Sequence, residues 1–310
     1  MRYHTRVWIV LAIWIGVVGC EHEGIHPDRT YNLAWIHGTR MERFDGSGSV
    51  IGIREAMFDL RHPEFAHIDL AYNNSRQWNG GHKEDQTHGT HILGILAADS
   101  SLRGLAPKAR YALTSTPNHN RAFEELEEAG AEVINSSFVM ADYAGYSYLT
   151  KKVTTQTLHA HGGRGIVHVF AAGNQGESIA AGVTFPAAFS DHALIVGELD
   201  EGDLTLCSNY GKDVDVFVQI PVFTTNAGGG YGIDRGSSCS TAVVTAVMAH
   251  ARTLRPDLNA TTLMRLVCAT ADHIGDVPYD LNDTDGNMRS RLYGCGSLNA
   301  DAFLDAVEAQ

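Results

Sequence analysis

The chain has 310 residues, 44% of them apolar and 19% charged, so it is long enough to bury one large core and has an ordinary globular composition. Its net charge of −13, without a run of lysines and arginines, argues against nucleic acid as a partner, because binding to phosphates needs clustered positive charge. The sequence contains no internal repeat and no low-complexity tract.

The first 19 residues are typical of an export signal rather than of a folded element. Residues 1–6 are basic, and residues 7–18 are nearly all apolar but too few to span a bilayer comfortably. The stretch ends in Val17-Val18-Gly19-Cys20, which resembles the end of a bacterial lipoprotein signal. A plain signal peptide or an uncleaved anchor is the alternative. We therefore expect an exported protein, anchored on the periplasmic or cell-surface side of a bacterial membrane by lipid on Cys20.

The rest of the chain predicts an α/β domain. Residues 20–47 are polar and contain Gly and Pro, which favours a tether and lead-in, and residues 48–310 form the expected domain. Predicted strands cover residues 50–54, 110–114, 133–136, 166–170, 193–196 and 214–218, and predicted helices cover residues 88–98, 121–129, 148–161, 238–254 and 261–271. Apolar strands that alternate with helices indicate a three-layer sandwich with a mostly parallel central sheet. Ligand sites on such sheets lie beyond the carboxyl ends of the strands.

Four cysteines follow Cys20 in the chain: Cys207, Cys239, Cys268 and Cys295. An exported protein meets an oxidising compartment, so disulfides are allowed, but spacing alone does not choose among three full pairings. We expect Cys268 to pair with Cys295. We interpret Cys239 as a small buried apolar residue, with a disulfide to Cys207 or another cysteine as the alternative. No zinc site is expected, because the sequence has no CxxC and no Cys/His spacing of the kind that binds this metal.

Three short segments carry the groups that acyl transfer requires. His88 begins a predicted helix, Asn174 follows a predicted strand, and Ser238 begins a long apolar helix. Each residue has an ordinary structural interpretation, as a buried histidine, a turn residue and a helix cap. Together they supply a base, an amide donor and a hydroxyl nucleophile, each beside small residues that let a substrate approach.

These segments resemble, in the same order, the histidine, asparagine and serine blocks of subtilisin-like serine peptidases, the subtilase family. The matching stretches are His88-Gly89-Thr90-His91, Ala171-Ala172-Gly173-Asn174 and Gly236-Ser237-Ser238-Cys239-Ser240, with weaker matches at residues 103–109, 131–137 and 293–300. The resemblance runs from about residue 48 to residue 308, almost the whole expected domain.

The resemblance implies a subtilisin-like fold and an endopeptidase mechanism. Ser238 is then the nucleophile, His88 the general base, and the Asn174 side chain with the Ser238 amide the oxyanion hole. A peptide substrate is expected to pair as an extended strand near residues 136–139. No organic cofactor is implied, and structural calcium is common in the family, although no site can be placed from this sequence.

The acid of the triad departs from the family pattern, which has aspartate first, then histidine, then serine. Counting back from His62-Pro63 places Glu55 at the aspartate position. Glutamate can orient an imidazole, but its extra methylene requires a shift of about 1 Å, which matters to catalysis. Asp59 and Asp85 are the alternative acids. The change also leaves open a catalytically inactive subtilase fold that serves as a peptide-binding protein or scaffold.

Residues 280–287 have the composition of a calcium-binding loop. Leu281 stands five residues before Gly286, where an EF-hand loop needs an oxygen ligand, so the register fails. We therefore predict a solvated turn.

Overall fold

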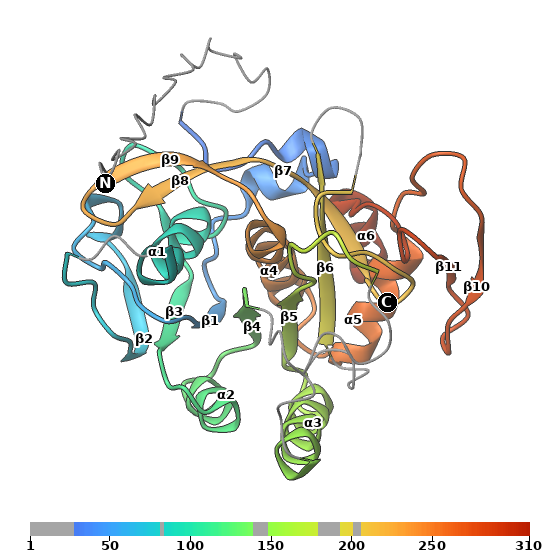
Figure 1. Cartoon of the computed structure of the whole chain (residues 1–310), viewed down its shortest axis with the longest axis horizontal. Helices are drawn as coiled ribbons and strands as arrows, with labels where there is room; N and C mark the ends of the chain where they lie inside the picture. Colours follow the sequence, from blue (N-terminus) through green and yellow to red (C-terminus); the bar gives the residue numbers. More distant parts are fainter. Residues whose placement is uncertain (1–27, 81–83, 139–147, 179–192, 201–205) are drawn as a thin grey trace, which may run out of the picture.

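The centre of the molecule is a seven-stranded sheet in which every neighbouring pair of strands is parallel (Figure 1). The structure is a computed structural model and describes residues 28–80, 84–138, 148–178, 193–200 and 206–310. The strand order is β2-β3-β1-β4-β5-β6-β7. The strands are β1 Val50–Arg54, β2 Asp69–Asn74, β3 Arg110–Thr114, β4 Val133–Ser136, β5 Val167–Ala171, β6 Ala193–Asp200 and β7 Val216–Ile220.

Helices cover both faces of the sheet, which confirms the predicted three-layer α/β sandwich. The helices are α1 Glu84–Ala97, α2 His119–Glu128, α3 Tyr148–Gly163, α4 Ser237–Leu254, α5 Ala260–Ala269 and α6 Ala300–Glu308. Side chains alternate along each strand: Ile51 and Ile53 of β1 share one core with α1 and α4, whereas Ile134 of β4 shares a second core with α2 and α3. This two-sided burial explains the continuous apolar runs of the central strands.

The predicted strands β1, β3 and β4 agree with the structure residue for residue, and the other predicted elements agree within a few residues. Strand β2 was not predicted, because it lies at the edge of the sheet and carries polar, exposed residues. Also unpredicted were α6 and two hairpins, β8 Val222–Asn226 with β9 Gly230–Asp234, and β10 Tyr279–Asn282 with β11 Met288–Ser290. Three short 3-10 helices complete the described elements: Leu33–Ile36, Arg40–Arg43 and Pro63–Phe65.

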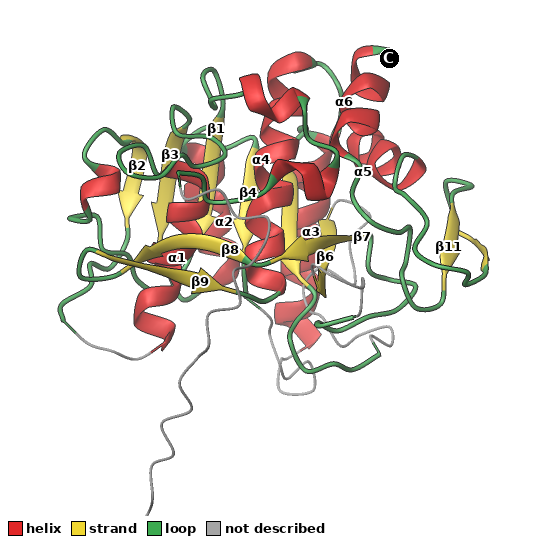
Figure 2. Cartoon of the chain, turned by 90° about the horizontal axis from the view of Figure 1, so that it is seen from above, coloured by secondary structure: helices red, strands yellow, loops and turns green. Residues whose placement is uncertain are grey.

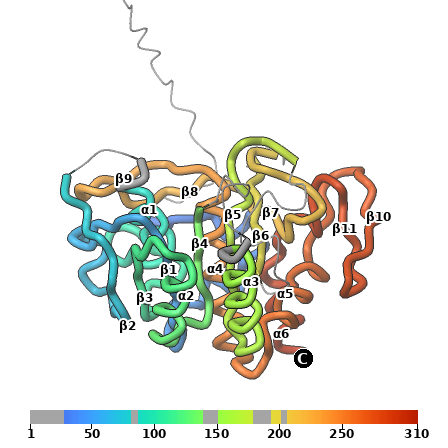
Figure 3. The backbone as a smooth tube through the Cα atoms, turned by 60° about the horizontal axis from the view of Figure 1, so that its bottom comes forward, coloured from blue at the N-terminus to red at the C-terminus, as the bar shows by residue number. Residues whose placement is uncertain are grey.

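The β8–β9 hairpin lies across helix α1 and leads directly into α4 (Figures 2 and 3). Thr224 Oγ1 donates to the carbonyl of His91 at 2.7 Å, and Thr225 Oγ1 donates to the carbonyl of Thr90 at 2.8 Å. Gly94 makes this contact possible, because a Cβ at that position would overlap both threonine hydroxyls. The hairpin is therefore fixed on α1 by hydrogen bonds and by close backbone approach.

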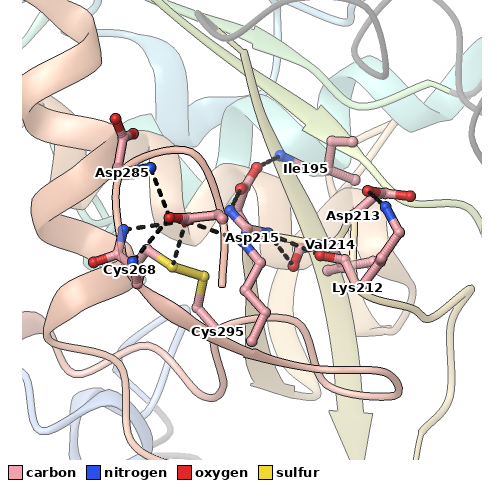
Figure 4. Close-up of polar contacts among 11 residues, drawn as sticks. Ile195, Lys212, Asp213, Val214, Asp215, Cys268, Asp285 and Cys295 are labelled. Atoms are coloured by element: carbon pink, nitrogen blue, oxygen red, sulfur yellow. Dashed lines mark hydrogen bonds and ion pairs between the residues drawn. A yellow bond between two sulfur atoms is a disulfide. The ribbon is translucent and has the colours of Figure 1, made fainter. Parts of the chain in front are cut away.

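The disulfide between Cys268 and Cys295 is present as expected, and it ties the end of α5 to the segment before α6 (Figure 4). Cys239 is a buried free thiol, so it forms no disulfide with Cys207. Arg289, which follows Met288 in β11, donates to Asp215 at 2.7 Å. This cluster fastens the β10–β11 hairpin to the main sheet.

The loop that resembles a calcium site in composition is an exposed turn closed by its own hydrogen bonds. Asp283 Oδ1 accepts from the backbone amides of Asp285 at 2.9 Å and Asn287 at 2.8 Å, and Oδ2 accepts from Arg289 at 3.3 Å (Figure 4). The carboxylate is thus occupied by donors. Within the described ranges, no three His, Cys, Asp or Glu side chains are grouped as metal ligands.

Residues 28–47, part of the expected lead-in, pack against the domain rather than extend from it. Tyr31, Ile36, Met41 and Phe44 are buried in the main core. Residues 1–27, with the expected signal and Cys20, lie outside the described residues, so the boundaries at residues 19 and 47 stay predictions. No helix in the described part of the chain has the length and apolar character needed to cross a membrane.

Candidate active site

Two expected site residues and the expected substrate segment follow the carboxyl ends of three neighbouring strands, β1, β4 and β5. Glu55 comes directly after β1, Ser137 comes directly after β4, and Asn174 lies three residues beyond β5. The strand order shows that connections leave β1 and β4 toward opposite edges of the sheet. Such a switch point is where α/β sheets collect functional groups, because neighbouring loops diverge there.

Glu55 forms a hydrogen bond with His88. Its Oε2 lies 3.0 Å from His88 Nδ1, and the side chains are 5% and 26% exposed. A carboxylate can only accept, so this contact places the ring proton on Nδ1 and leaves Nε2 as the basic nitrogen. The second oxygen of Glu55, Oε1, is buried and accepts no hydrogen bond from the described residues.

Gly89 explains how His88 comes so close to the segment that leaves β1. A Cβ on Gly89 would overlap the carbonyl oxygen of Met57 and lie 3.0 Å from the Cβ of Glu55. Helix α1 therefore contacts this segment through backbone, which a larger residue would prevent. Gly89 thus allows α1 to lie close enough to β1 for the Glu55 side chain to reach His88.

The alternative acid Asp59 forms hydrogen bonds with groups other than His88. Its side chain is 3% exposed. Oδ2 accepts from the amide of Gly228 at 2.8 Å, in the turn of the β8–β9 hairpin, and Oδ1 accepts from Arg61 Nε at 3.2 Å. Asp59 thus anchors the hairpin, and Glu55 is the acid in contact with His88. The other alternative, Asp85, has its side chain outside the described part of the structure.

Asn174 is held against the start of α4. Its Oδ1 accepts from both the backbone amide of Ser237 at 2.9 Å and the Ser237 hydroxyl at 2.8 Å. With the oxygen engaged, the NH₂ group is the end available as a donor to a substrate. Gly236 has φ 118°, and a Cβ there would lie 2.9 Å from Asn174 Nδ2. Only glycine fits both that backbone conformation and that contact.

Ser238 is the second residue of α4 and is partly exposed. Its hydroxyl donates to the carbonyl of Ser137 at 3.0 Å, and the Ser137 hydroxyl donates to the carbonyl of Ser238 at 2.9 Å. This reciprocal pair joins the start of α4 to the end of β4. A helix amino end presents backbone amides and a partial positive charge, which favour a negative charge nearby.

The structure thus forms two contacts among the expected residues, Glu55 with His88 and Asn174 with the Ser237–Ser238 segment. These contacts lie on α1 and α4, and the two helices pack against each other. Near the expected substrate strand, Phe138 is partly buried under the guanidinium of Arg54, 4.2 Å above the ring, whereas Val139 lies outside the described residues.

A second carboxylate–imidazole pair beside these residues was not predicted. Asp234 Oδ2, at the end of β9, lies 2.8 Å from His91 Nδ1 on α1. The two residues are 143 positions apart. The position of Asp234 four residues before Ser238 was the only signal in the sequence, and it does not reveal the partner.

We predict that Gly89→Ala lowers the free energy of unfolding by about 1–3 kcal/mol, because the new methyl group must force α1 away from Met57. The loss outweighs a gain of up to about 1 kcal/mol from helix propensity. Urea denaturation of the wild type and the variant measures the net change in the free energy of unfolding. Gly163→Ala in α3 is the control, since a Cβ there meets no atom within 4 Å, and it should cost nothing. Equal stability of the two variants would contradict the close approach.

Sequence comparison relates the chain to known peptidases. The profile of the subtilase family matches residues 46–296. The chain is 29% identical to the cell wall-associated protease of Bacillus subtilis (strain 168) over 240 residues, which cover 72% of this chain and 25% of that protein. It is 26% identical to subtilisin DY of Bacillus licheniformis over 230 residues, which cover 69% of this chain and 76% of that protein.

Two solved structures share the fold. The subtilisin-like protease Apa1 of Pseudoalteromonas sp. AS-11 superposes with a TM-score of 0.69 at 14% identity, over 88% of this chain and 98% of that chain. The MycP3 protease of the type VII (ESX-3) secretion system gives a TM-score of 0.67 at 22% identity, over 91% of this chain and 90% of that chain. The chain spans only a quarter of the cell wall-associated protease and 54% of the thermostable alkaline protease of Halalkalibacterium halodurans. With the family profile matching most of its length, the chain belongs to the subtilase family.

Proposed function

We propose that this protein is a serine endopeptidase that hydrolyses peptide bonds through an acyl-enzyme. The observation that carries the proposal is the hydrogen bond between Glu55 and His88, because it orients the imidazole as a base despite the change from aspartate. Family membership supports a serine peptidase. The roles of individual residues, and the substrate, are our proposal.

Catalysis begins when the Ser238 hydroxyl turns from the carbonyl of Ser137 toward Nε2 of His88. The serine oxygen attacks the peptide carbonyl carbon while His88 takes its proton. His88 then gives that proton to the leaving amine as the C–N bond breaks. Water attacks the resulting ester by the same route and frees Ser238. Glu55 holds the ring tautomer and stabilises the imidazolium in both steps.

The negative oxygen of the tetrahedral intermediate is stabilised by two donors, the NH₂ group of Asn174 and the backbone amide of Ser238. The hydrogen bonds from Ser237 fix the Asn174 oxygen and so aim its NH₂ group before substrate arrives. Donors that need no reorganisation contribute most to transition-state stabilisation. The partial charge at the start of α4 acts in the same direction.

The substrate binds as an extended strand beside the segment that continues β4. In this arrangement residues 136–138 offer backbone groups to the peptide, and the carbonyl of Ser137 is already next to the nucleophile. Main-chain pairing of this kind provides affinity with little dependence on sequence. The proposed partner is therefore a peptide or protein segment in extended conformation.

We predict that a fluorophosphonate probe labels the folded protein at Ser238, and that Ser238→Ala abolishes labelling. Mass spectrometry of the modified peptide identifies the site. Ser240→Ala is the matched control, because Ser240 lies on the same helix with a buried hydroxyl that has no hydrogen-bond partner in the described structure. The control should label normally. A folded wild-type protein that does not label would instead favour a non-catalytic peptide-binding protein or scaffold.

We expect Glu55→Gln to lower kcat by about 10³–10⁴-fold with little change in stability, since an amide can present the wrong group to Nδ1 of His88. Peptide hydrolysis and thermal unfolding are the two measurements. Asp59→Asn tests the alternative acid: its carboxylate holds the β8–β9 turn, so it should lose stability but keep turnover within about tenfold. Full activity of Glu55→Gln would mean that another group orients the base.

We also propose that lipid on Cys20 anchors the protein to a bacterial membrane. The support is the sequence of residues 1–20 alone. In a bacterial host, a clickable palmitate analogue should label the wild type, and Cys20→Ser should abolish labelling and shift the protein to the soluble fraction. Cys207→Ser, at an exposed cysteine, is the control. Unchanged labelling of Cys20→Ser would contradict the anchor.

A further inference from the structure

Asp234 and His91 form a hydrogen-bonded pair beside the proposed catalytic residues, and the mechanism above does not use it. Asp234 Oδ2 lies 2.8 Å from His91 Nδ1, with side chains 30% and 17% exposed. His91 lies three residues after His88 on α1, so the two imidazoles share one side of that helix. Asp234 ends β9, four residues before Ser238. The pair therefore joins the helix of the base to the strand that leads to the nucleophile.

We propose that Asp234, held by His91, is a positioning residue whose carboxylate stabilises the protonated form of His88 during catalysis, in addition to Glu55. This inference rests on the proposed peptidase mechanism and deepens it. Asp234 acts through His88 and does not itself touch the substrate.

The carboxylate of Asp234 is held at both oxygens. Oδ2 meets His91, and Oδ1 accepts from the backbone amide of Arg235 at 2.9 Å. Asp234 lies in β9, and the partner strand β8 is fixed to α1 by the hydrogen bonds from Thr224 and Thr225. A charge that cannot move away keeps a constant influence on a neighbouring group, which is the condition for electrostatic preorganisation.

The surroundings of Asp234 favour its ionised carboxylate over the protonated acid. Burial opposes its ionisation, but the hydrogen bond and charge of His91, the Arg235 amide and the charge of His88 together lower the pKa of Asp234. The influence of two charges is mutual, so the Asp234 carboxylate favours the imidazolium form of His88 equally. Because His91 lies one helical turn beyond His88, its contact with Asp234 also places this carboxylate close to His88.

The other titratable groups around Asp234 do not supply this charge. Burial raises the pKa of the Cys239 thiol on α4, and Asp234 raises it further. Burial also raises the pKa of Glu198 on β6, which is 3% exposed. The guanidinium of Arg235 pairs with Asp200 at 2.9 Å.

The direct test is the titration of His88 followed by NMR of its imidazole Cε1–H, in the Ser238→Ala background, which needs no turnover. Asp234→Asn should lower the midpoint of His88 by about half a pH unit, the size expected for removing one charge at intermediate distance. Asp257→Asn is the control, since it removes an exposed charge that pairs with Arg255. In this control the titration midpoint of His88 should not change.

Kinetics give the second readout. In otherwise native protein, Asp234→Asn should move the acid limb of the kcat/KM profile to lower pH by the same amount and reduce kcat on the plateau about two- to tenfold. Asp234→Glu should restore the limb, and His91→Gln, which keeps a donor to Asp234, should leave it near its native position. A purely structural role would change stability without moving the limb.

A folded Asp234→Asn protein with an unmoved His88 midpoint overturns the proposal. If that variant does not fold, Asp234→Ser removes the same charge and is judged in the same way. The proposed function is tested separately: a wild type that neither labels nor hydrolyses peptide refutes the peptidase mechanism, while the NMR midpoint still shows whether Asp234 stabilises protonated His88.

Discussion

The close backbone contact between α1 and the segment that leaves β1 is the constraint on which the rest of the site depends. Gly89 permits it, and it brings the ring of His88 to the buried carboxylate of Glu55. A glycine inside a helix costs stability, so its presence here is best explained by that approach. The same helix carries the β8–β9 hairpin through Thr224 and Thr225. Two contacts of one helix thus position His88 and the hairpin that leads to Ser238.

The parallel sheet explains why residues far apart in the chain meet. Glu55, Ser137 and Asn174 each follow a different strand of the β1-β4-β5 group, and parallel strands end at the same edge. Helix α4 then presents Ser238 at its amino end, where the partial positive charge and backbone amides suit a negative transition state. Reciprocal hydrogen bonds between Ser137 and Ser238 lock the strand edge to the helix.

The glutamate in place of the family's aspartate has a physical consequence as well as a geometric one. Glu55 reaches His88 through one oxygen, and its other oxygen is buried without a donor from the described residues. A carboxylate with fewer hydrogen bonds is a costlier charge to bury. The Asp234 carboxylate, which accepts from His91 one helical turn beyond His88, is a second negative charge beside this site. We infer that the charge balance of this site is shared between two carboxylates.

The fold class could be predicted from the sequence, because buried parallel strands and amphipathic helices leave periodic apolar patterns that need no knowledge of contacts. Motif order and the spacing from His62 also predicted Glu55, His88, Asn174 and Ser238 as candidate site residues. The contacts of Asp59 with the turn of the β8–β9 hairpin and of Asp234 with His91, 143 positions away, became visible only in the folded chain. Spacing along a chain reports local neighbours, whereas such pairings are set by how β8–β9 packs on α1.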